Sequence, residues 1–169
     1  YECYLTSQIP SAIESSAKVL ALWRELGDRL AEGRTLRFLS RLYWFLGDRL
    51  KADRFAVEAI EVLSALPAGR DLAMAYSNRS QLGMLKGDSS SAIEYGEKAV
   101  TLARALSDVE VESHALNNIG TAKLALGIKA GEEELERSLE LARSKDLHEH
   151  VARAYVNLST TSRSGRNVS

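Results

Sequence analysis

Three arginines have a spacing that could let them bind an anion together. Arg34, Arg37 and Arg41 are three and four residues apart, so they share one face if this stretch is helical. A guanidinium fork pairs well with carboxylate or phosphate, and Trp44, nearly one turn further on, could add aromatic stacking. The pattern predicts an anion-binding face. The alternative interpretation is a solvated basic face that binds nothing.

A recurring asparagine gives a second candidate. Asn78, Asn118 and Asn157 follow one another at steps of 40 and 39 residues, and Phe38 takes the corresponding place earlier in the chain. A carboxamide both donates and accepts hydrogen bonds, so it could pair with the backbone of an extended peptide whatever its side chains. The alternative is that each asparagine bonds the backbone of a neighbouring helix and only fixes the fold.

The sequence offers little for catalysis, cofactors or metals. His148 and His150 are two residues apart, which does not bring them together on a helix, while His114 and Cys3 stand alone. The chain contains no G-x-x-x-x-G-K-[ST] phosphate loop, no basic recognition helix and no spacing typical of a nucleophilic triad. We therefore expect no catalytic residue, no cofactor and no metal ligand in this chain.

Composition narrows the class of protein. The 169 residues are 45% hydrophobic and 27% charged, with a formal net charge of −1, which argues against a nucleic-acid-binding domain. No apolar run approaches the ~18 residues of a membrane span, no signal peptide is evident, and the single cysteine suits a reducing compartment. We expect a soluble, cytoplasmic chain that does not bind membranes. Because it starts at Tyr1 and has no closing cap, we also expect it to be part of a longer protein.

The elements that must position these residues repeat along the chain. Residues 71–106 are echoed one unit earlier and one unit later, with Gly47, Gly87 and Gly127 at a constant step of 40. Self-similarity at such a period indicates stacked supersecondary units. Ala92, Gly96 and Ala99 form a row of small side chains that should let a neighbouring helix approach closely.

Hydrophobic periodicity predicts an all-α chain of about eight helices. Residues 1–7 should be the end of a helix, and Ile9-Pro10-Ser11 a turn before the next one. Gly47-Asp48 should end one helix and cap the next. The letters GDRL occur at 27–30 and 47–50, and we attribute this to chance because the step of 20 does not fit the period. The expected helices cover residues 11–26, 31–46, 49–65, 71–86, 89–106, two within 109–145, and 148–161.

These helices predict one repeat array over residues 1–161, followed by a polar, frayed tail over 162–169. None of them can bury its apolar stripe alone, so antiparallel pairs must stack, and the end helices should leave apolar surface for end-to-end self-association. The predicted units are 1–26 (partial), 31–66, 71–106, 109–145 and 148–161 (partial).

Two resemblances add to this interpretation. NNIGTAKLALG at 117–127 and GDSSSAIEYGEKAVTLAR at 87–104 resemble the tetratricopeptide repeat (TPR), although the 40-residue period exceeds the common period of about 34 and only Pro67 ends a unit. This resemblance implies a right-handed superhelix of antiparallel helix pairs, an α-solenoid whose first helices line a concave groove. The segments YECYLT, LPAGRDLAMAYSN and HALNNIGTA resemble the repeat region of large LuxR-type transcriptional regulators, which carry an AAA-like ATPase and a helix-turn-helix elsewhere.

The resemblances imply a binding module, the sensor or interaction segment of such a regulator. Its partner would be a protein, a peptide or a small effector held in the groove. The alternatives are a free-standing adaptor of the co-chaperone type and a helical oligomerisation segment of an enzyme. The expected groove residues are Arg34, Arg37, Arg41, Trp44, Met74, Asn78, Gln81, His114, Asn117, Asn118, Arg153 and Asn157.

Overall fold

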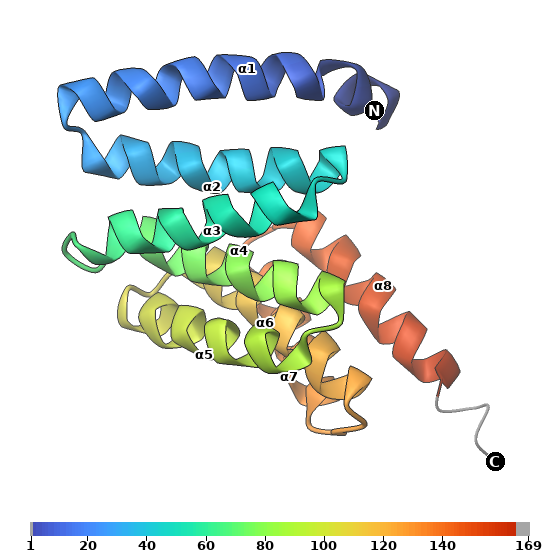
Figure 1. Cartoon of the computed structure of the whole chain (residues 1–169). Coiled ribbons are helices and arrows are strands. Elements are labelled where there is room, and N and C mark those ends of the chain that lie inside the picture. Colours follow the sequence, from blue (N-terminus) through green and yellow to red (C-terminus); the bar gives the residue numbers. More distant parts are fainter. Residues whose placement is uncertain (1, 165–169) are drawn as a thin grey trace. The chain divides into compact units, whose positions relative to one another are not determined.

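The chain is all-helical in the part that the structure describes. The computed structural model describes residues 2–164, and the side chains of residues 8–159. It contains eight helices and no strand within those residues (Figure 1), which confirms the predicted fold class. The helices are α1 Glu2–Leu26, α2 Arg29–Leu46, α3 Arg49–Ser64, α4 Arg70–Lys86, α5 Ser89–Ala105, α6 Val109–Ala125, α7 Gly131–Ser144 and α8 His148–Ser164.

The helices fall into two compact units. Unit 1 is Tyr1–Asn78 and unit 2 is Arg79–Ser169, so their boundary lies inside α4. In unit 1, α1 packs on α2 and α2 on α3; in unit 2, α6 packs on α5 and α7, and α8 packs on α7 and α6. These are the antiparallel neighbours that the repeat predicts, whereas the predicted array over residues 1–161 as a whole stays a prediction.

The predicted turn at Ile9-Pro10-Ser11 is wrong. Helix α1 runs unbroken from Glu2 to Leu26 with Pro10 inside it. Ile9 is buried while Pro10 is exposed, so the proline ring faces away from the packed side of the helix. Burial of the apolar side thus outweighs the helix-breaking tendency of proline here.

The predicted chain ends are described only in part. Residues 2–7 belong to helix α1, but their side chains, including that of Cys3, lie outside the described residues. At the other end α8 continues to Ser164, and residues 165–169 of the predicted tail also lie outside the described part.

Both copies of GDRL form the same turn, so attributing the match to chance was wrong. Gly27 and Gly47 have φ values of 72° and 87°, the left-handed conformation that glycine adopts at low cost. The following aspartates cap the next helix: Asp28 accepts from the Ala31 N–H at 2.9 Å and Asp48 from that of Lys51 at 3.0 Å. The turn recurs wherever a helix ends and the next begins within two residues.

In unit 1 the core lies between α1, α2 and α3. It is built from buried aliphatic side chains with half-buried aromatics at its edge. Gly33 belongs to this contact: a Cβ at this position would lie 2.4 Å from Leu63 Cγ, so α2 and α3 approach more closely than alanine would allow. The core residues are Leu20, Leu36, Leu39, Ala59 and Val62, with Ile13, Tyr43 and Phe55 packed against them.

In unit 2 small residues set the helix spacing. Ala92 and Ala99 are fully buried, and a Cβ on Gly96 would lie 2.4 Å from Ile119 Cγ1. This confirms the predicted role of the small-residue row. At the contact between α6 and α7 the neighbour is backbone rather than a side chain, because a Cβ on Gly120 would lie 2.6 Å from the Gly131 carbonyl oxygen.

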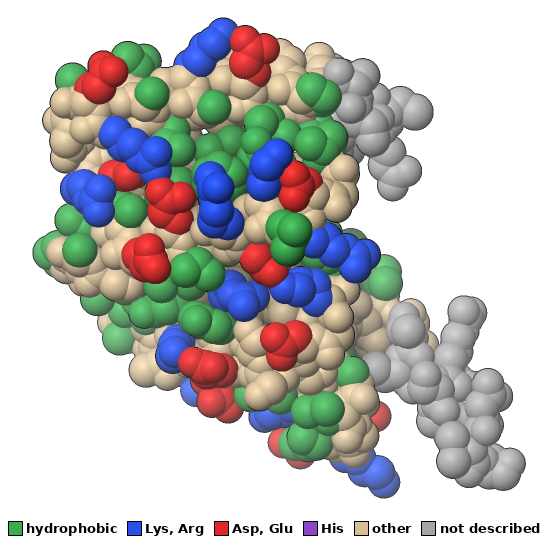
Figure 2. Space-filling model, viewed as in Figure 1, with side chains coloured by type: hydrophobic (Ala, Val, Ile, Leu, Met, Phe, Trp, Pro, Cys, Tyr) green, Lys and Arg blue, Asp and Glu red, His purple; other side chains and the backbone are tan. Residues whose placement is uncertain are grey.

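Charge is distributed without a single-sign field on the face that Figure 2 shows, where basic and acidic side chains alternate with apolar ones. Among the described residues, no helix combines the length and the apolar character needed to cross a bilayer.

Candidate functional site

The three predicted arginines lie on α2 in unit 1, and the start of α4 meets them. The exposed side chain of Arg34 donates two hydrogen bonds to Asp71, from Nε to Oδ1 at 2.9 Å and from Nη2 to Oδ2 at 2.8 Å. This is the bidentate fork expected between guanidinium and carboxylate. The bonded Asp71 raises the pKa of Arg34. An internal carboxylate therefore occupies one of the three predicted anion-binding groups.

Arg37 lies half-buried beside this pair and has no such partner. Its Nε is enclosed without a hydrogen-bond acceptor in the described part of the chain. Burial lowers the pKa of Arg37, and the positive charges of Arg41, Arg70 and Arg34 lower it further, while Asp71 alone opposes them. The charge on Arg37 is thus desolvated and repelled by its surroundings.

These residues define a site that we call the basic cluster: Arg34, Arg37, Arg41 and Arg70, with Asp71 among them. Four arginine charges against one aspartate charge leave a formal +3. Sequence reasoning found the three α2 members but missed Arg70 and Asp71. Asp71 lies 37 residues after Arg34, close to one repeat step, and this spacing is the signal that could have located it and the adjacent Arg70.

Trp44 does not join the basic cluster as a free aromatic surface. The Arg49 guanidinium, from the first residue of α3, lies 5.5 Å from the centre of its ring. A cation already covers this half-buried indole, so the predicted stacking surface for a ligand is occupied from within the chain.

The recurring asparagines bond neighbouring helices. Asn78 Nδ2 on α4 donates to Ser40 Oγ on α2 at 3.0 Å, and Asn157 Nδ2 on α8 donates to Asn117 Oδ1 on α6 at 2.7 Å. Asn118 is fully buried. The contacts of Asn78 and Asn157 each join two helices within one unit, and they go to side chains rather than to the backbone that the fold-fixing alternative expected.

In unit 2 two histidines that are far apart in sequence meet. The rings of His114 on α6 and His150 on α8 pack edge to face with centroids 5.6 Å apart, and His150 Nε2 is 3.8 Å from Glu110 Oε1. Burial and the neighbouring Arg153 lower the pKa of His150, while Glu110 and Glu149 raise it. The sequence showed His114 as isolated, because only the contact between α6 and α8 brings the two rings together.

The other predicted residues divide between the units. Met74 is half-buried in unit 1 and Gln81 half-buried in unit 2. Arg153 is half-buried on α8, where its Nη2 lies 3.2 Å from Glu149 Oε1. Two groups therefore emerge: the basic cluster in unit 1, and the polar α6–α8 contact that holds His114, Asn117, Arg153 and Asn157.

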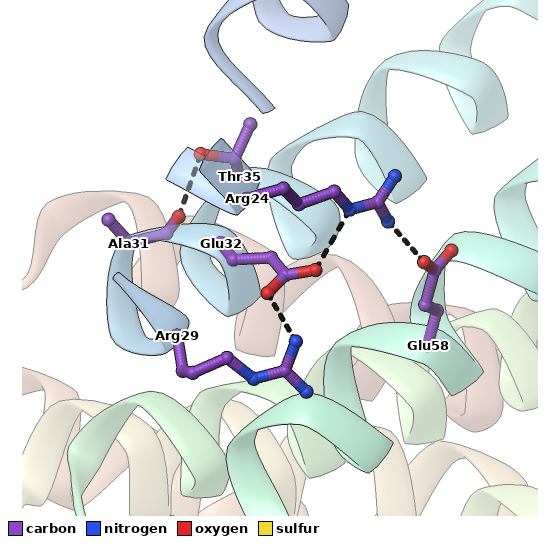
Figure 3. A network of polar contacts seen from close by, with 6 residues as sticks. All are labelled: Arg24, Arg29, Ala31, Glu32, Thr35 and Glu58. Carbon is purple, nitrogen blue, oxygen red and sulfur yellow. Dashed lines mark hydrogen bonds and ion pairs between the residues drawn. The ribbon is translucent and has the colours of Figure 1, made fainter. Parts of the chain in front are cut away.

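In a second polar network in unit 1, the arginines have carboxylate partners. Glu32 on α2 is only 3% exposed and accepts from Arg24 Nε at 2.9 Å and from Arg29 Nη1 at 2.6 Å (Figure 3). Arg24 also donates to Glu58 on α3, and its hydrogen bond to Glu32 is the main reason that its pKa is raised. The network links α1, α2 and α3, and it lines a surface hollow of about 430 Å³.

No cation site accompanies these groups: the described residues contain no set of three His, Cys, Asp or Glu side chains arranged to hold a metal ion. In unit 2 a hollow of about 300 Å³ opens between α5, α6 and α7, with an apolar floor of Val100, Leu116 and Ile119 under a rim of both charges.

The comparisons with known proteins concern the fold. No protein-family model matches the chain, and neither does any curated protein. Among solved structures it is similar to aspartyl phosphate phosphatase F from Bacillus subtilis, with a TM-score of 0.76 and 16% identity over 94% of this chain and 43% of that one. It is also similar to BtubC from P. vanneervenii, with a TM-score of 0.70 and 23% identity over 95% of this chain and 66% of that one.

A third similar structure is a kinesin-light-chain-like protein from Podospora anserina with nearly identical TPR-like repeats, with a TM-score of 0.74 and 15% identity over 99% of this chain and 84% of that one. At these identities the likeness concerns the fold alone: the chain is built of TPR-like helical repeats. It spans less than two thirds of the first two structures.

Proposed function

We propose that this chain is a partner-binding helical-repeat module, the sensor or interaction segment of a LuxR-type transcriptional regulator in the cytoplasm. TPR-like neighbours support the binding role. The resemblance of its repeat segments to such regulators supports the parent. In this role the chain has no catalytic activity of its own; it binds a protein, a peptide or a small effector and passes that event to ATPase and DNA-binding segments.

The basic cluster is the observation that carries the binding role. TPR-like packing needs apolar stripes, caps and small residues, and none of these requires a half-buried arginine whose Nε has no acceptor. Arg24 and Arg34 show that this fold can supply a carboxylate to an arginine. An enclosed Nε that is left without an acceptor on α2 is therefore better explained by a group that comes from outside the chain.

The coding sequence on either side of this chain tests the parent. A nucleotide-binding loop upstream and a helix-turn-helix downstream would support the regulator. If neither were encoded, the regulator would be excluded and a free-standing adaptor would be the better proposal.

Charge reversal tests the binding role. We expect Arg37→Glu to lower the affinity for a partner, once captured by cross-linking and identified, at least tenfold in calorimetry, because the variant replaces an unpaired cation with a like charge for an acidic group. Arg54→Glu, on the exposed side of α3, carries the same charge change and should bind as the wild type. Equal affinity of the Arg37 variant and the wild type would contradict the proposed site.

A further inference from the structure

We propose that the basic cluster is an oxyanion site, which takes a phosphate or carboxylate group presented by the partner. The inference deepens the proposed function, and the identity of the partner as a protein rests on that function. The chemistry of the site follows from the cluster alone.

The first step is the arrangement of the arginines along α2. Arg34, Arg37 and Arg41 are three and four residues apart on one helix, so their side chains leave the same face. Arg70, the first residue of α4 and the neighbour of Asp71, adds a fourth positive charge that acts on Arg37. Positive charges from two helices thus act on Arg37.

The second step is the role of Asp71. Each of its two oxygens accepts one hydrogen bond from the fork of Arg34, while the enclosed Nε of Arg37 has no acceptor in the described part of the chain. This pair fixes the guanidinium of Arg34 and shows that an oxyanion fits against the cluster. With Arg34 paired, the formal excess of positive charge in the basic cluster lies on Arg37, Arg41 and Arg70, and Asp71 is the one carboxylate among the charges that act on Arg37.

The third step is the cost of the unliganded site. Enclosing an N–H donor without an acceptor loses the hydrogen bond that it made with water. An arginine with a purely structural role would be expected to bond a carboxylate or a carbonyl, as Arg24 bonds Glu32. An oxyanion at Arg37 would supply the acceptor and reduce the repulsion at once, and its binding would stabilise the fold by linkage.

Thermal unfolding of the full chain in sodium phosphate, against sodium chloride at equal ionic strength, tests the proposal. We expect phosphate to raise the Tm above the chloride control, since chloride screens charge but offers no fork-matched oxygens. Arg37→Met keeps the apolar stem and should abolish this phosphate-specific rise while leaving the Tm in chloride equal or higher. Arg54→Met removes one charge elsewhere on unit 1 and should keep the rise.

A second variant excludes misfolding as the explanation for a lost phosphate effect. Asp71→Asn removes the carboxylate that competes for the cluster but keeps an oxygen for Arg34, so we expect it to bind phosphate several-fold more tightly in calorimetry. A phosphate effect no larger than that of chloride, or one that survives Arg37→Met, would overturn the oxyanion site. Unchanged phosphate affinity in a folded Asp71→Asn would also count against it.

Small peptides separate the two sources of the oxyanion. N-acetylated, C-amidated Gly-phosphoserine-Gly, Gly-Glu-Gly and Gly-Ser-Gly present a phosphate, a carboxylate and neither. We expect the phosphopeptide to bind at least tenfold more tightly than the glutamate peptide, because its charge of about −1.5 to −2 better matches the cluster. Tighter binding of the glutamate peptide would support the site with carboxylate as its source, whereas a serine peptide that binds as tightly as the other two would contradict the site.

The outcomes also distinguish this inference from the proposed function. If phosphate binds through Arg37 but no macromolecular partner is captured, the oxyanion site stands and the partner-binding role fails. If a partner binds Arg37→Met and wild type equally, the role stands and the oxyanion inference fails.

Discussion

The arginines of unit 1 differ in their hydrogen-bond partners. Arg24 and Arg29 both donate to the buried carboxylate of Glu32, and Arg34 donates to the carboxylate of Asp71. Arg37, by contrast, has an enclosed Nε without an acceptor. Helical spacing placed Arg34 and Arg37 on one face but could not tell them apart. The difference depends on which carboxylate a second helix brings, which is a tertiary contact.

His150 gives a prediction at the same scale. The fold lowers its pKa from an unfolded value near 6.5, so the folded state disfavours the charged imidazole. Stability is therefore fully present above pH ~6.5 and is lost as pH falls through the folded pKa. The groups around it are Glu110 and His114 on α6 and Glu149 and Arg153 on α8.

We expect the Tm of the wild type to fall between about pH 7.5 and pH 5.5, and His150→Gln to show a smaller fall, because glutamine does not titrate. Differential scanning calorimetry across this range measures it. His148→Gln, at an exposed position on the same helix, is the matched control and should keep the wild-type profile. An identical pH profile in His150→Gln and wild type would show that the ring carries none of the dependence.

At the scale of elements, caps and close contacts decide where helices end and how near they come. Asp48 illustrates the caps, since its bonds to the backbone and side chain of Lys51 lower its pKa. Gly120 illustrates the contacts. Its hydrogen faces the Gly131 carbonyl across the α6–α7 contact, and a methyl group there would lie 2.6 Å from that oxygen.

Gly120→Ala should therefore lower the free energy of unfolding by about 1–3 kcal/mol, because backbone rather than a flexible side chain would have to move. Urea denaturation measures this change. Gly69→Ala provides the comparison: a Cβ there meets only the Pro67 carbonyl oxygen at 3.8 Å, and we expect a change within about 0.5 kcal/mol. A Gly120→Ala protein as stable as the wild type would show that α6 and α7 can separate freely.

Most of the element pattern could be predicted from sequence because its determinants are local. Gly47-Asp48 and Gly87-Asp88 mark their turns with two residues, and apolar periodicity supplies the helices between them. The prediction of a turn at Pro10 was wrong because the choice between turn and helix depended on the burial of Ile9. The pairing of His114 with His150 could not be predicted from the sequence for a similar reason, because it depends on the contact between α6 and α8.

At the scale of the whole chain, an apolar face on α1 stands open. Val19, Leu22 and Leu26 are 39%, 55% and 73% exposed. Shifted by one 40-residue step, the first two fall on Ala59 and Val62 of α3, which are 0% and 5% exposed. The face of α1 that corresponds to the buried face of α3 is thus exposed to solvent.

We therefore keep the prediction that the chain self-associates through an end helix. Light scattering should show a mass that rises with concentration over the micromolar range, because burying such side chains yields about 1.5–3 kcal/mol each. Leu22→Glu should shift the chain toward monomer, whereas Val57→Glu, at an exposed position on α3, should not. A constant monomer mass in the wild type would exclude this association.

The Gly-Asp turn has a further consequence for how such an array can grow. The same two residues join α1 to α2 and α2 to α3, with a left-handed glycine and a capping aspartate at each joint. A gene duplication could therefore begin at either joint and still leave every copied helix with its own start and stop. A crossover at either joint would therefore leave the turn and both of its helix ends intact.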